Sequence, residues 1–286
     1  MGAGSLSTGW RLKVVHQTRV RYDGPAAASY NEARMTPPTG HRQSVLETSL
    51  STNVATSIWA YTDYWGAIVS SFDIQAPHHE LVIRARATVE TRPAPRPGPP
   101  PQWAVLHATG GKRLLEFLTP TARTAVDGAL AETARQRTAG ADPHEAAADL
   151  AAWVSDRVAY VPGVTGVQTS AQEAWDKGQG VCQDMAHLTV ALFREVGLPA
   201  RYVSGYLHPR SDAEPGDEME GQSHAWVEYW AGEWLPCDPT TRAEVGERHV
   251  LVATGRDYGD VPPVKGIYHG APNSTMTVTV AVTRLA

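Results

Sequence analysis

A chain of 286 residues is long enough to bury a large hydrophobic core, and two domains are the natural expectation. The net charge of -5 gives no reason to expect nucleic acid or an anionic membrane as a partner. No apolar run reaches the length that spans a bilayer, and the first residues lack the pattern of a secretion signal. Since the chain has only two cysteines, a disulfide framework is excluded and we expect a reducing, cytoplasmic location.

The first third of the chain predicts short strands and no helix. Residues 10–22 alternate between apolar and polar side chains, which is the pattern of a half-buried strand. Similar segments, separated by turn residues, follow at 43–50, 58–61, 67–74 and 79–90. Such a series indicates an antiparallel β-sandwich over residues 1–92. His78 and His79 suggest a metal pair, but no third ligand has a recognisable spacing, so we interpret them as the start of a strand.

A proline-rich segment divides the chain in two. Residues 93–101 hold six prolines in nine positions, so we expect a stiff, extended linker followed by a second domain over residues 102–286. Beyond the linker, residues 120–140 are rich in alanine and arginine and predict a helix. The Asp-Pro pair at 142–143 has the residue types of an N-cap and a first helical position, and it predicts the start of another helix.

Cys182 lies at the start of a predicted helix, and a short helix capped at residues 169–170 precedes it. Apolar residues recur at helical spacing over 183–196, Gly197 is placed for a left-handed C-terminal cap, and Pro199 prevents continuation. Free backbone N–H groups and the positive end of the helix dipole favour a thiolate there, and the same groups can hold an oxyanion. A small buried structural residue is the alternative interpretation of this cysteine.

A hairpin is predicted over residues 223–238, with its turn at an Ala-Gly pair. This turn sets Trp226 opposite Asp238, so that His224 and Asp238 are diagonal neighbours on one face. Asp238 can then accept the imidazole N–H and leave the other ring nitrogen for Cys182, which is the arrangement of thiol acyl transfer. A slip of one residue in the register would destroy the alignment.

Residues 208–222 are expected to form a long acidic loop after a strand at 200–207. A loop of this length inside a compact domain is often a lid or a substrate wall. Its charges are otherwise those of a solvated surface, and both interpretations stay open. Calcium binding by the acidic cluster is not indicated, because the ligand spacing of an EF-hand is absent.

Three blocks in a fixed order carry a family resemblance: 180–187 (GVCQDMAH), 223–228 (SHAWVE) and 238–240 (DPT). They resemble bacterial members of the transglutaminase-like superfamily. Segments within 19–32 are similar to the β-rich N-terminal domain that accompanies this core, and residues 255–263 are similar to its C-terminal signature. The resemblance therefore covers most of the chain.

The resemblance implies an α+β fold, in which a papain-like core with its cysteine helix packed on an antiparallel sheet follows the sandwich. It implies that Cys182 is the nucleophile, His224 the general base and acid, and Asp238 the orienting carboxylate. Thr241 and Cys237 depart from the residues usual in relatives, and we interpret them as a turn residue and a core residue. No cofactor is implied, and nothing here matches the calcium sites of the animal enzymes.

Six further residues are candidate substrate contacts: Gln183, Asp184, Trp226, Arg256, Asp257 and Tyr258. Helix capping is the alternative role for Asp184, and an ion pair with Asp257 is the alternative for Arg256. The second donor to an oxyanion is not identified by any spacing rule.

Other classes of function remain open from the sequence. One is a zinc module that uses the following thiol and imidazole groups: Cys182, His187, His224 and Cys237. Another is a non-catalytic binding scaffold of the same fold. A disulfide between the two cysteines would abolish the thiol chemistry.

The expected substrate is a peptide or a small amide. A protease or amidase and an amine-accepting transferase share every step up to the thioester, so the sequence does not separate them. Hydrolysis is favoured, because water is the default acceptor.

Overall fold

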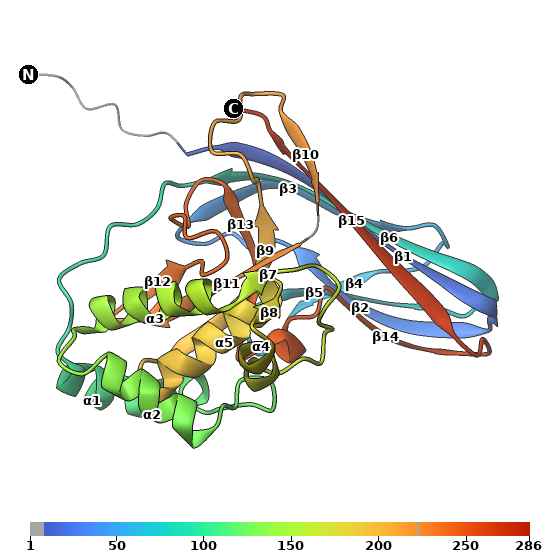
Figure 1. Cartoon of the computed structure of the whole chain (residues 1–286). Helices are drawn as coiled ribbons and strands as arrows, with labels where there is room; N and C mark the ends of the chain where they lie inside the picture. The colour runs from blue at the N-terminus through green and yellow to red at the C-terminus, as the bar shows by residue number, and fades with distance from the viewer. Residues whose placement is uncertain (1–8, 222) are drawn as a thin grey trace, which may run out of the picture.

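The computed structural model describes residues 9–221 and 223–286, without the side chains of residues 109–113. Helices gather on one side of the molecule, and long antiparallel strands extend away from them (Figure 1). None of the helices in the described ranges is both long and apolar enough to cross a membrane. Residues 1–8 of the predicted sandwich and residue 222 of the predicted acidic loop lie outside the described residues.

Two antiparallel sheets form the β-rich part of the fold. The N-terminal strands are β1 (Arg11–Ala26), β2 (Ala28–Thr36), β3 (Gln43–Thr52), β4 (Trp59–Thr62), β5 (Ile68–Ile74) and β6 (His78–Thr91). Three later strands join them: β10 (Glu218–Gly221), β14 (Val264–His269) and β15 (Ser274–Arg284). The strand orders are β10-β15-β1-β6-β3 in one sheet and β14-β2-β5-β4 in the other.

A hydrophobic core fills the space between these two sheets. Val20 and Ile83 enter it from β1 and β6, and Met35 and Phe72 meet them from β2 and β5. All four side chains are buried, so each sheet covers the apolar face of the other. The antiparallel β-sandwich predicted from the sequence is confirmed.

The sequence does not predict β2, because two of its buried positions are polar. Ser29 and Asn31 alternate with more exposed neighbours and share the interior with Ala33 and Met35. The Asn31 amide donates to the Ser29 hydroxyl at 3.1 Å, so the buried polar groups satisfy each other. An alternation of this kind carries little of the hydrophobic contrast by which a strand is predicted.

The last strand of the chain belongs to the sandwich and not to the sheet of the 102–286 region, with which it was grouped from the sequence. β15 pairs antiparallel along β1, down to Ser274 opposite Tyr22. Along this strand Met276 and Val278 are 52% and 37% exposed, whereas Val280 and Val282 are buried. Alternation predicts a strand but does not tell which sheet it joins, since that depends on a partner far away in the chain.

Part of the predicted acidic loop is also a strand. β10 pairs with β15 at the edge of the larger sheet. Within the loop, Arg210 forms ion pairs with Asp212 and with Asp217, at 3.2 Å and 3.0 Å. The acidic groups are thus partly neutralised by a neighbour in the same segment.

The second half of the chain supplies the helices and a third sheet. The helices are α1 (Trp103–Arg113), η1 (Leu115–Phe117), α2 (Gly128–Arg137), α3 (Pro143–Arg157), α4 (Ala171–Lys177), α5 (Cys182–Glu195) and η2 (Tyr258–Asp260). The strands are β7 (Ala159–Tyr160), β8 (Gln179–Gly180), β9 (Ala200–Leu207), β11 (His224–Trp230), β12 (Trp234–Cys237) and β13 (His249–Gly255). Four of them form an antiparallel sheet in the order β12-β11-β9-β13.

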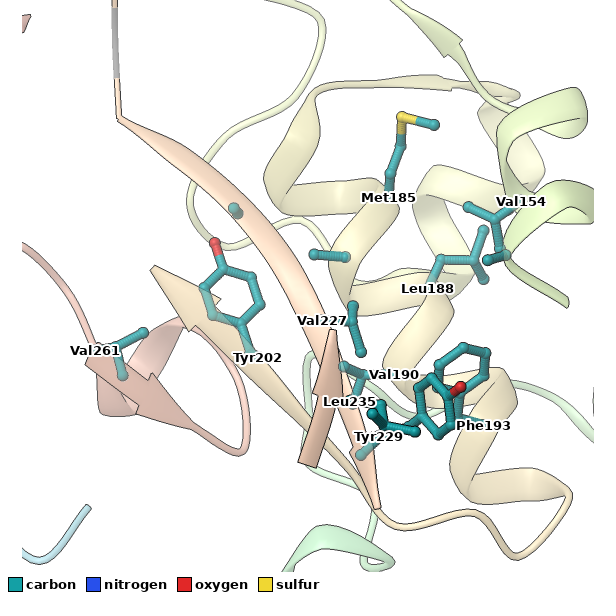
Figure 2. Close-up of a cluster of buried hydrophobic side chains, with 14 of the residues drawn as sticks. Val154, Met185, Leu188, Val190, Phe193, Tyr202, Val227, Tyr229, Leu235 and Val261 are labelled. Carbon is teal, nitrogen blue, oxygen red and sulfur yellow. The ribbon is translucent and has the colours of Figure 1, made fainter. Parts of the chain in front are cut away.

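Helix α5 packs on this third sheet, as the papain-like architecture requires. Figure 2 shows Val190 of α5 beside Val227 of β11, and Phe193 beside Tyr229. The ring centroids of Phe193 and Tyr229 are 5.8 Å apart in an edge-to-face arrangement. Leu188 faces α3 on the other side of the helix, where it lies near Val154 (Figure 2). The α+β fold predicted from the sequence is confirmed.

Local signals predict the helix ends better than the helix extents. Asp142 and Ser170 cap α3 and α4 through complete capping boxes, and Gly197 has a φ of 82° just beyond α5, as predicted. The helix predicted over 120–140 forms only as α2, because the Asp127 side chain caps it by accepting the N–H of Leu130. Helix α1 was not predicted.

Arg194, near the end of α5, ties the helix to the chain around it. Arg194 is 6% exposed, and in the described part of the chain its guanidinium donates to five uncharged oxygens: Phe117 O, Thr119 O, Thr124 Oγ1, Ala200 O and Arg256 O. Burial lowers the pKa of Arg194 to about 10, so the group is still a cation at neutral pH. One buried cation thus holds together the loop before α2, the start of β9 and the end of β13.

Replacing Arg194 with methionine should lower the free energy of unfolding by about 3–5 kcal/mol, because several buried carbonyl oxygens lose their donor together. Urea denaturation followed by circular dichroism measures the change. Arg135→Met is the matched control, since Arg135 is 46% exposed and bonds only to acidic side chains on the surface. That control should lose no more than about 1 kcal/mol. Equal losses in the two variants would contradict the role of Arg194.

Candidate active site

Cys182 is the first residue of α5, and the preceding chain is shaped to place it there. Gly178 ends α4 in the left-handed conformation, with a φ of 63°. A Cβ at Gly180 would lie 2.8 Å from the Cβ of Asp184, so this position needs glycine. The Asp184 carboxylate accepts the backbone N–H of Val181 at 2.8 Å. The thiol therefore lies at a fixed helix start, beside its own backbone N–H, which an α-helix leaves without an acceptor in a preceding turn.

Two of the candidate substrate contacts hold the loop before α4 instead. Asp184 is 1% exposed, and the same oxygen that caps the helix also accepts the hydroxyl of Thr165 at 2.6 Å. The Gln183 amide donates to the carbonyl oxygen of Gly166 at 3.4 Å. Asp184 is therefore closed to a substrate, while Gln183 stays partly exposed at the same helix start.

The hairpin has the register that the sequence predicts. Val227 pairs with Cys237, so the next step along the two arms sets Trp226 opposite Asp238. His224 Nε2 lies 2.8 Å from Asp238 Oδ2, and the Cys182 thiol is close enough to the ring to help raise its pKa. Because Nε2 faces the carboxylate, Nδ1 is the ring nitrogen left for the sulfur. The predicted contact between His224 and Asp238 is confirmed, and the structure brings all three groups together.

The charge state of His224 is set by two opposing effects. Burial disfavours its protonation, but Asp238 and Cys182 beside the ring outweigh burial and raise its pKa to about 9. The ring is therefore an imidazolium at neutral pH. A cation beside a cysteine stabilises the thiolate, which is the reactive form.

Asp238 remains ionised although it is 4% exposed. Burial alone would raise its pKa, but hydrogen bonds from His224, His249 and Thr241 hold it far below the usual range. Thr241 Oγ1 donates to Oδ2 at 2.6 Å, and the backbone N–H groups of Thr240 and Thr241 donate to Oδ1 at 2.9 Å and 3.3 Å. Thr241 thus supports the carboxylate directly. This role was not predicted, because the sequence indicates a turn residue only.

Two aromatic side chains pack behind the His224 ring. Trp226 stacks with it at a centroid distance of 6.0 Å and an interplanar angle of 27°. His249 lies edge-on to Trp226 at 5.3 Å, with its Nε2 3.5 Å from Asp238 Oδ2. Trp226 is 2% exposed, so it backs the site and is closed to a substrate. His249 was not predicted, because no local pattern links it to the hairpin.

The remaining candidate contacts lie around η2 and have structural partners. Arg256 pairs with Asp260 at 2.9 Å, and its expected pairing with Asp257 is not formed. Asp257 is buried, accepts the N–H of Gly259 and lies 3.7 Å from Arg123. These contacts hold the η2 turn in place without a substrate. 

Tyr258 anchors η2 to the cysteine helix. Its backbone N–H donates to His187 Nε2 at 3.0 Å, and its ring is partly buried. Burial lowers the pKa of His187 to about 3, so this ring is neutral and serves as an acceptor. His187 is fully buried and belongs to the interior of the protein.

The zinc interpretation does not fit the geometry. Among the described residues, the side chains whose ligand atoms converge are His224, Asp238 and His249, and this set lacks Cys182, His187 and Cys237. The three that converge are already joined by hydrogen bonds at Asp238. The four residues proposed as zinc ligands are therefore not grouped as a tetrahedral site requires.

Both cysteines are free, so the disulfide alternative is excluded for this structure. Cys237 packs against the main hydrophobic core from β12, as the strand alternation predicts. Burial raises the pKa of Cys237 to about 12, which keeps it a neutral thiol. Only Cys182 is paired with an imidazole.

Tyr160 is a residue at the site that the sequence did not reveal. It lies in β7, which pairs in parallel with the glycine-containing β8 just before Cys182. Its side chain is 55% exposed, and burial together with the nearby Cys182 raises its pKa. An exposed aromatic ring beside the thiol is suited to forming a wall for a substrate.

Comparisons with known proteins agree with this geometry. A family model described as the transglutaminase-like superfamily matches residues 131–239, and one described as the bacterial transglutaminase-like N-terminal region matches residues 12–90. An uncharacterized protein of Mycobacterium leprae is 43% identical over 278 residues, covering 97% of this chain and 100% of that protein. One of Mycobacterium tuberculosis is 34% identical over 296 residues, covering 97% and 94%.

Two further matches concern part of the chain and the fold. The protein-glutamine gamma-glutamyltransferase of Pseudomonas aeruginosa is 33% identical over 122 residues, which are 39% of this chain and 18% of that protein. The crystal structure of a candidate cysteine protease from Cytophaga hutchinsonii has a TM-score of 0.79 and 22% identity, and the match covers 98% of this chain and 92% of that one. The two family models, together with the 43% identical protein of Mycobacterium leprae, show that the chain belongs to the transglutaminase-like superfamily and carries the bacterial N-terminal region of that family.

Proposed function

We propose that this protein is a thiol acyl-transfer enzyme that acts on amide bonds. Cys182 is the nucleophile, His224 the general base and acid, and Asp238 the carboxylate that orients the ring. The observation that carries the proposal is the 2.8 Å hydrogen bond between the His224 ring and the ionised Asp238, with Cys182 beside the same ring.

The reaction follows from the positions of these groups. The Cys182 thiolate attacks the carbonyl carbon, and the first-turn N–H groups of α5 stabilise the oxyanion that forms. His224 passes its proton to the leaving amine as the C–N bond breaks, which leaves an acyl-thioester on the sulfur. His224 then takes a proton from the incoming water or amine, whose attack releases the acyl group and restores the thiolate.

We favour water as the acceptor, and hence a protease or amidase. Water needs no binding site of its own, and the imidazole that has just released its proton is ready to activate it. Transfer to an amine is the second candidate, supported by the name of the Pseudomonas aeruginosa relative. The proposed substrate is a peptide or small amide that reaches Cys182 past the exposed ring of Tyr160.

The proposal includes a cytoplasmic location and excludes nucleic acid and membrane as partners. Two free cysteines, one of them reactive, are typical of a reducing compartment. The net charge of -5 gives no attraction to a polyanion.

Mass spectrometry of the trapped intermediate tests the acyl-transfer reaction. The protein is mixed with a library of peptide amides and γ-glutamyl amides, quenched in acid and digested. An acyl adduct on the peptide that contains Cys182 is expected, and it should be absent from Cys182→Ala. Adding a primary amine in excess distinguishes the two acceptors, because only a transferase yields the acylated amine. A library that leaves no adduct would favour the non-catalytic scaffold.

Alkylation supplies a test that needs no substrate. At pH 7, iodoacetamide should label Cys182 at least about tenfold faster than free cysteine, because the thiolate fraction controls the rate. Cys237 serves as an internal control and should stay unlabelled in the folded protein, because burial raises its pKa to about 12. The His224→Ala variant should lose the fast labelling. Equal labelling rates for Cys182 and free cysteine would contradict the proposal that Cys182 is the nucleophile of an enzyme.

The raised pKa of His224 predicts a definite pH dependence. The ring should titrate near 9 in the folded protein, compared with about 6.5 when unfolded, so its contribution to stability is complete below about 6.5 and is lost as the pH rises through 9. The rate should fall over the same range, because the acid that protonates the leaving amine disappears. NMR of the His224 Cε1–H resonance measures the titration, and the apparent value belongs to the pair with Cys182.

Asp238→Asn is the companion variant for this titration. Without the carboxylate, the His224 pKa should fall toward the ordinary value, and catalysis should drop by roughly 10⁴. An unchanged titration in this variant would show that Asp238 does not set the charge of the ring.

A further inference from the structure

His249 is a buried group beside the triad that the proposed reaction does not use. It begins β13, is 5% exposed, and approaches the same oxygen of Asp238 that accepts His224 and Thr241. The separation of His249 Nε2 from Asp238 Oδ2 is 3.5 Å, which is long for an N–H···O bond. Catalytic hydrogen bonds are often long in the absence of substrate and shorten in the complex.

The direction of this hydrogen bond is fixed by the other side of the ring. His249 Nδ1 accepts the backbone N–H of Gly246 at 3.4 Å, so the ring proton lies on Nε2 and points at Asp238. The backbone N–H of His249 returns a bond to the carbonyl oxygen of Gly246 at 3.0 Å. The turn therefore sets both the tautomer and the orientation of the imidazole, as partners of ligating and catalytic histidines commonly do.

The sandwich and the linker hold this turn in place. A Cβ at Gly246 would lie 2.6 Å from the backbone nitrogen of Ala94 in the proline-rich linker, so the two backbones touch there. Thr91 of β6 donates its hydroxyl to the carbonyl oxygen of Glu247. The buried Gln43 side chain of β3 pairs with both backbone groups of Leu251, at 2.8 Å and 2.9 Å. His249 is thus the point at which contacts from the N-terminal region reach the triad.

The charges around His249 keep its ring neutral. Burial lowers its pKa first of all, the hydrogen bond and negative charge of Asp238 oppose this, and the nearby charges of His224 and Arg248 add to the lowering. Since Asp238 already faces one imidazolium at His224, a second cation on the same carboxylate is disfavoured. A neutral donor adds a hydrogen bond without adding charge.

We propose that His249 is a positioning residue of the acyl-transfer site, which holds the Asp238 carboxylate in the orientation that serves His224. The role rests on the proposed function, since it matters through the ring that activates Cys182. The proposal predicts that, without the His249 N–H, the Asp238 carboxylate can rotate. This rotation weakens the hydrogen bond that keeps His224 protonated.

Two variants of nearly equal shape distinguish the effect of the N–H donor of His249 from the effect of the volume that its side chain fills. His249→Gln keeps an N–H at about the distance of Nε2, and His249→Met has the same length without it. The His224 Cε1–H titration should stay near 9 in His249→Gln and move toward about 6.5 in His249→Met. Alkylation of Cys182 at pH 7 should fall about tenfold in His249→Met and less than about threefold in His249→Gln.

Three results would overturn the proposal. A His224 titration near 9 in both variants would leave His249 a packing residue only. The His224 pKa could instead rise in His249→Met, which would mean that His249 acts by drawing charge from Asp238. Equal shifts in the two variants would assign the effect to the ring itself. If His249→Met does not fold, His249→Asn, whose amide is too short to reach Asp238, takes its place in the same comparison.

The titration also keeps this proposal separate from the proposed function. The pKa of His224 reports on its contact with Asp238, and its measurement needs no substrate. A shift in His249→Met together with no acyl adduct on Cys182 would support the positioning role and refute the amide chemistry. An acyl adduct on Cys182 together with an unchanged His224 pKa in His249→Met would support the amide chemistry and refute the positioning role.

Discussion

The buried negative charge of Asp238 is the interaction on which the site depends. A carboxylate removed from water is stabilised only if hydrogen bonds replace its hydration. Here the backbone after β12, the hydroxyl of Thr241 and two imidazoles converge on it. Because Asp238 stays ionised, His224 keeps its proton and one ring orientation. The His224 imidazolium then lies beside Cys182 at the start of the cysteine helix. In the proposed reaction, the reactivity of Cys182 therefore depends on an anion that lies on a different element.

This dependence explains why a β-sandwich and a papain-like core are built as one unit. The third sheet carries the ring and the carboxylate on its hairpin, while β13 closes the opposite edge of the sheet. The sandwich hydrogen-bonds to β13 through the side chain of Gln43, and the linker packs against the turn that precedes β13. A group that orients a catalytic base must itself be held within a fraction of an ångström. The contacts from the N-terminal region supply that rigidity from outside the core.

The parts predicted from the sequence are those with a local cause. A short turn sets the register of the hairpin, so the meeting of His224 with Asp238 followed from counting residues on its two arms. Capping residues likewise marked the starts of α3 and α4. His249 was missed because it comes to Asp238 through the pairing of β13 with β9, where a bulge shifts the register and no nearby residue signals it. Asp184 and Trp226 were misassigned as substrate contacts because sequence proximity to a nucleophile does not reveal burial.

The pairing of β1 with β15 has a consequence for how the molecule is made. These strands are neighbours in the sheet but are separated by nearly the whole chain, so one edge of β1 has no partner until synthesis reaches the last strand. Closing so long a loop is slow, and an open strand edge invites pairing with other chains. On the ribosome the nascent sandwich therefore still lacks β14 and β15 when the cysteine helix and its sheet have been synthesised, and one edge of β1 stays open until the last strand is made.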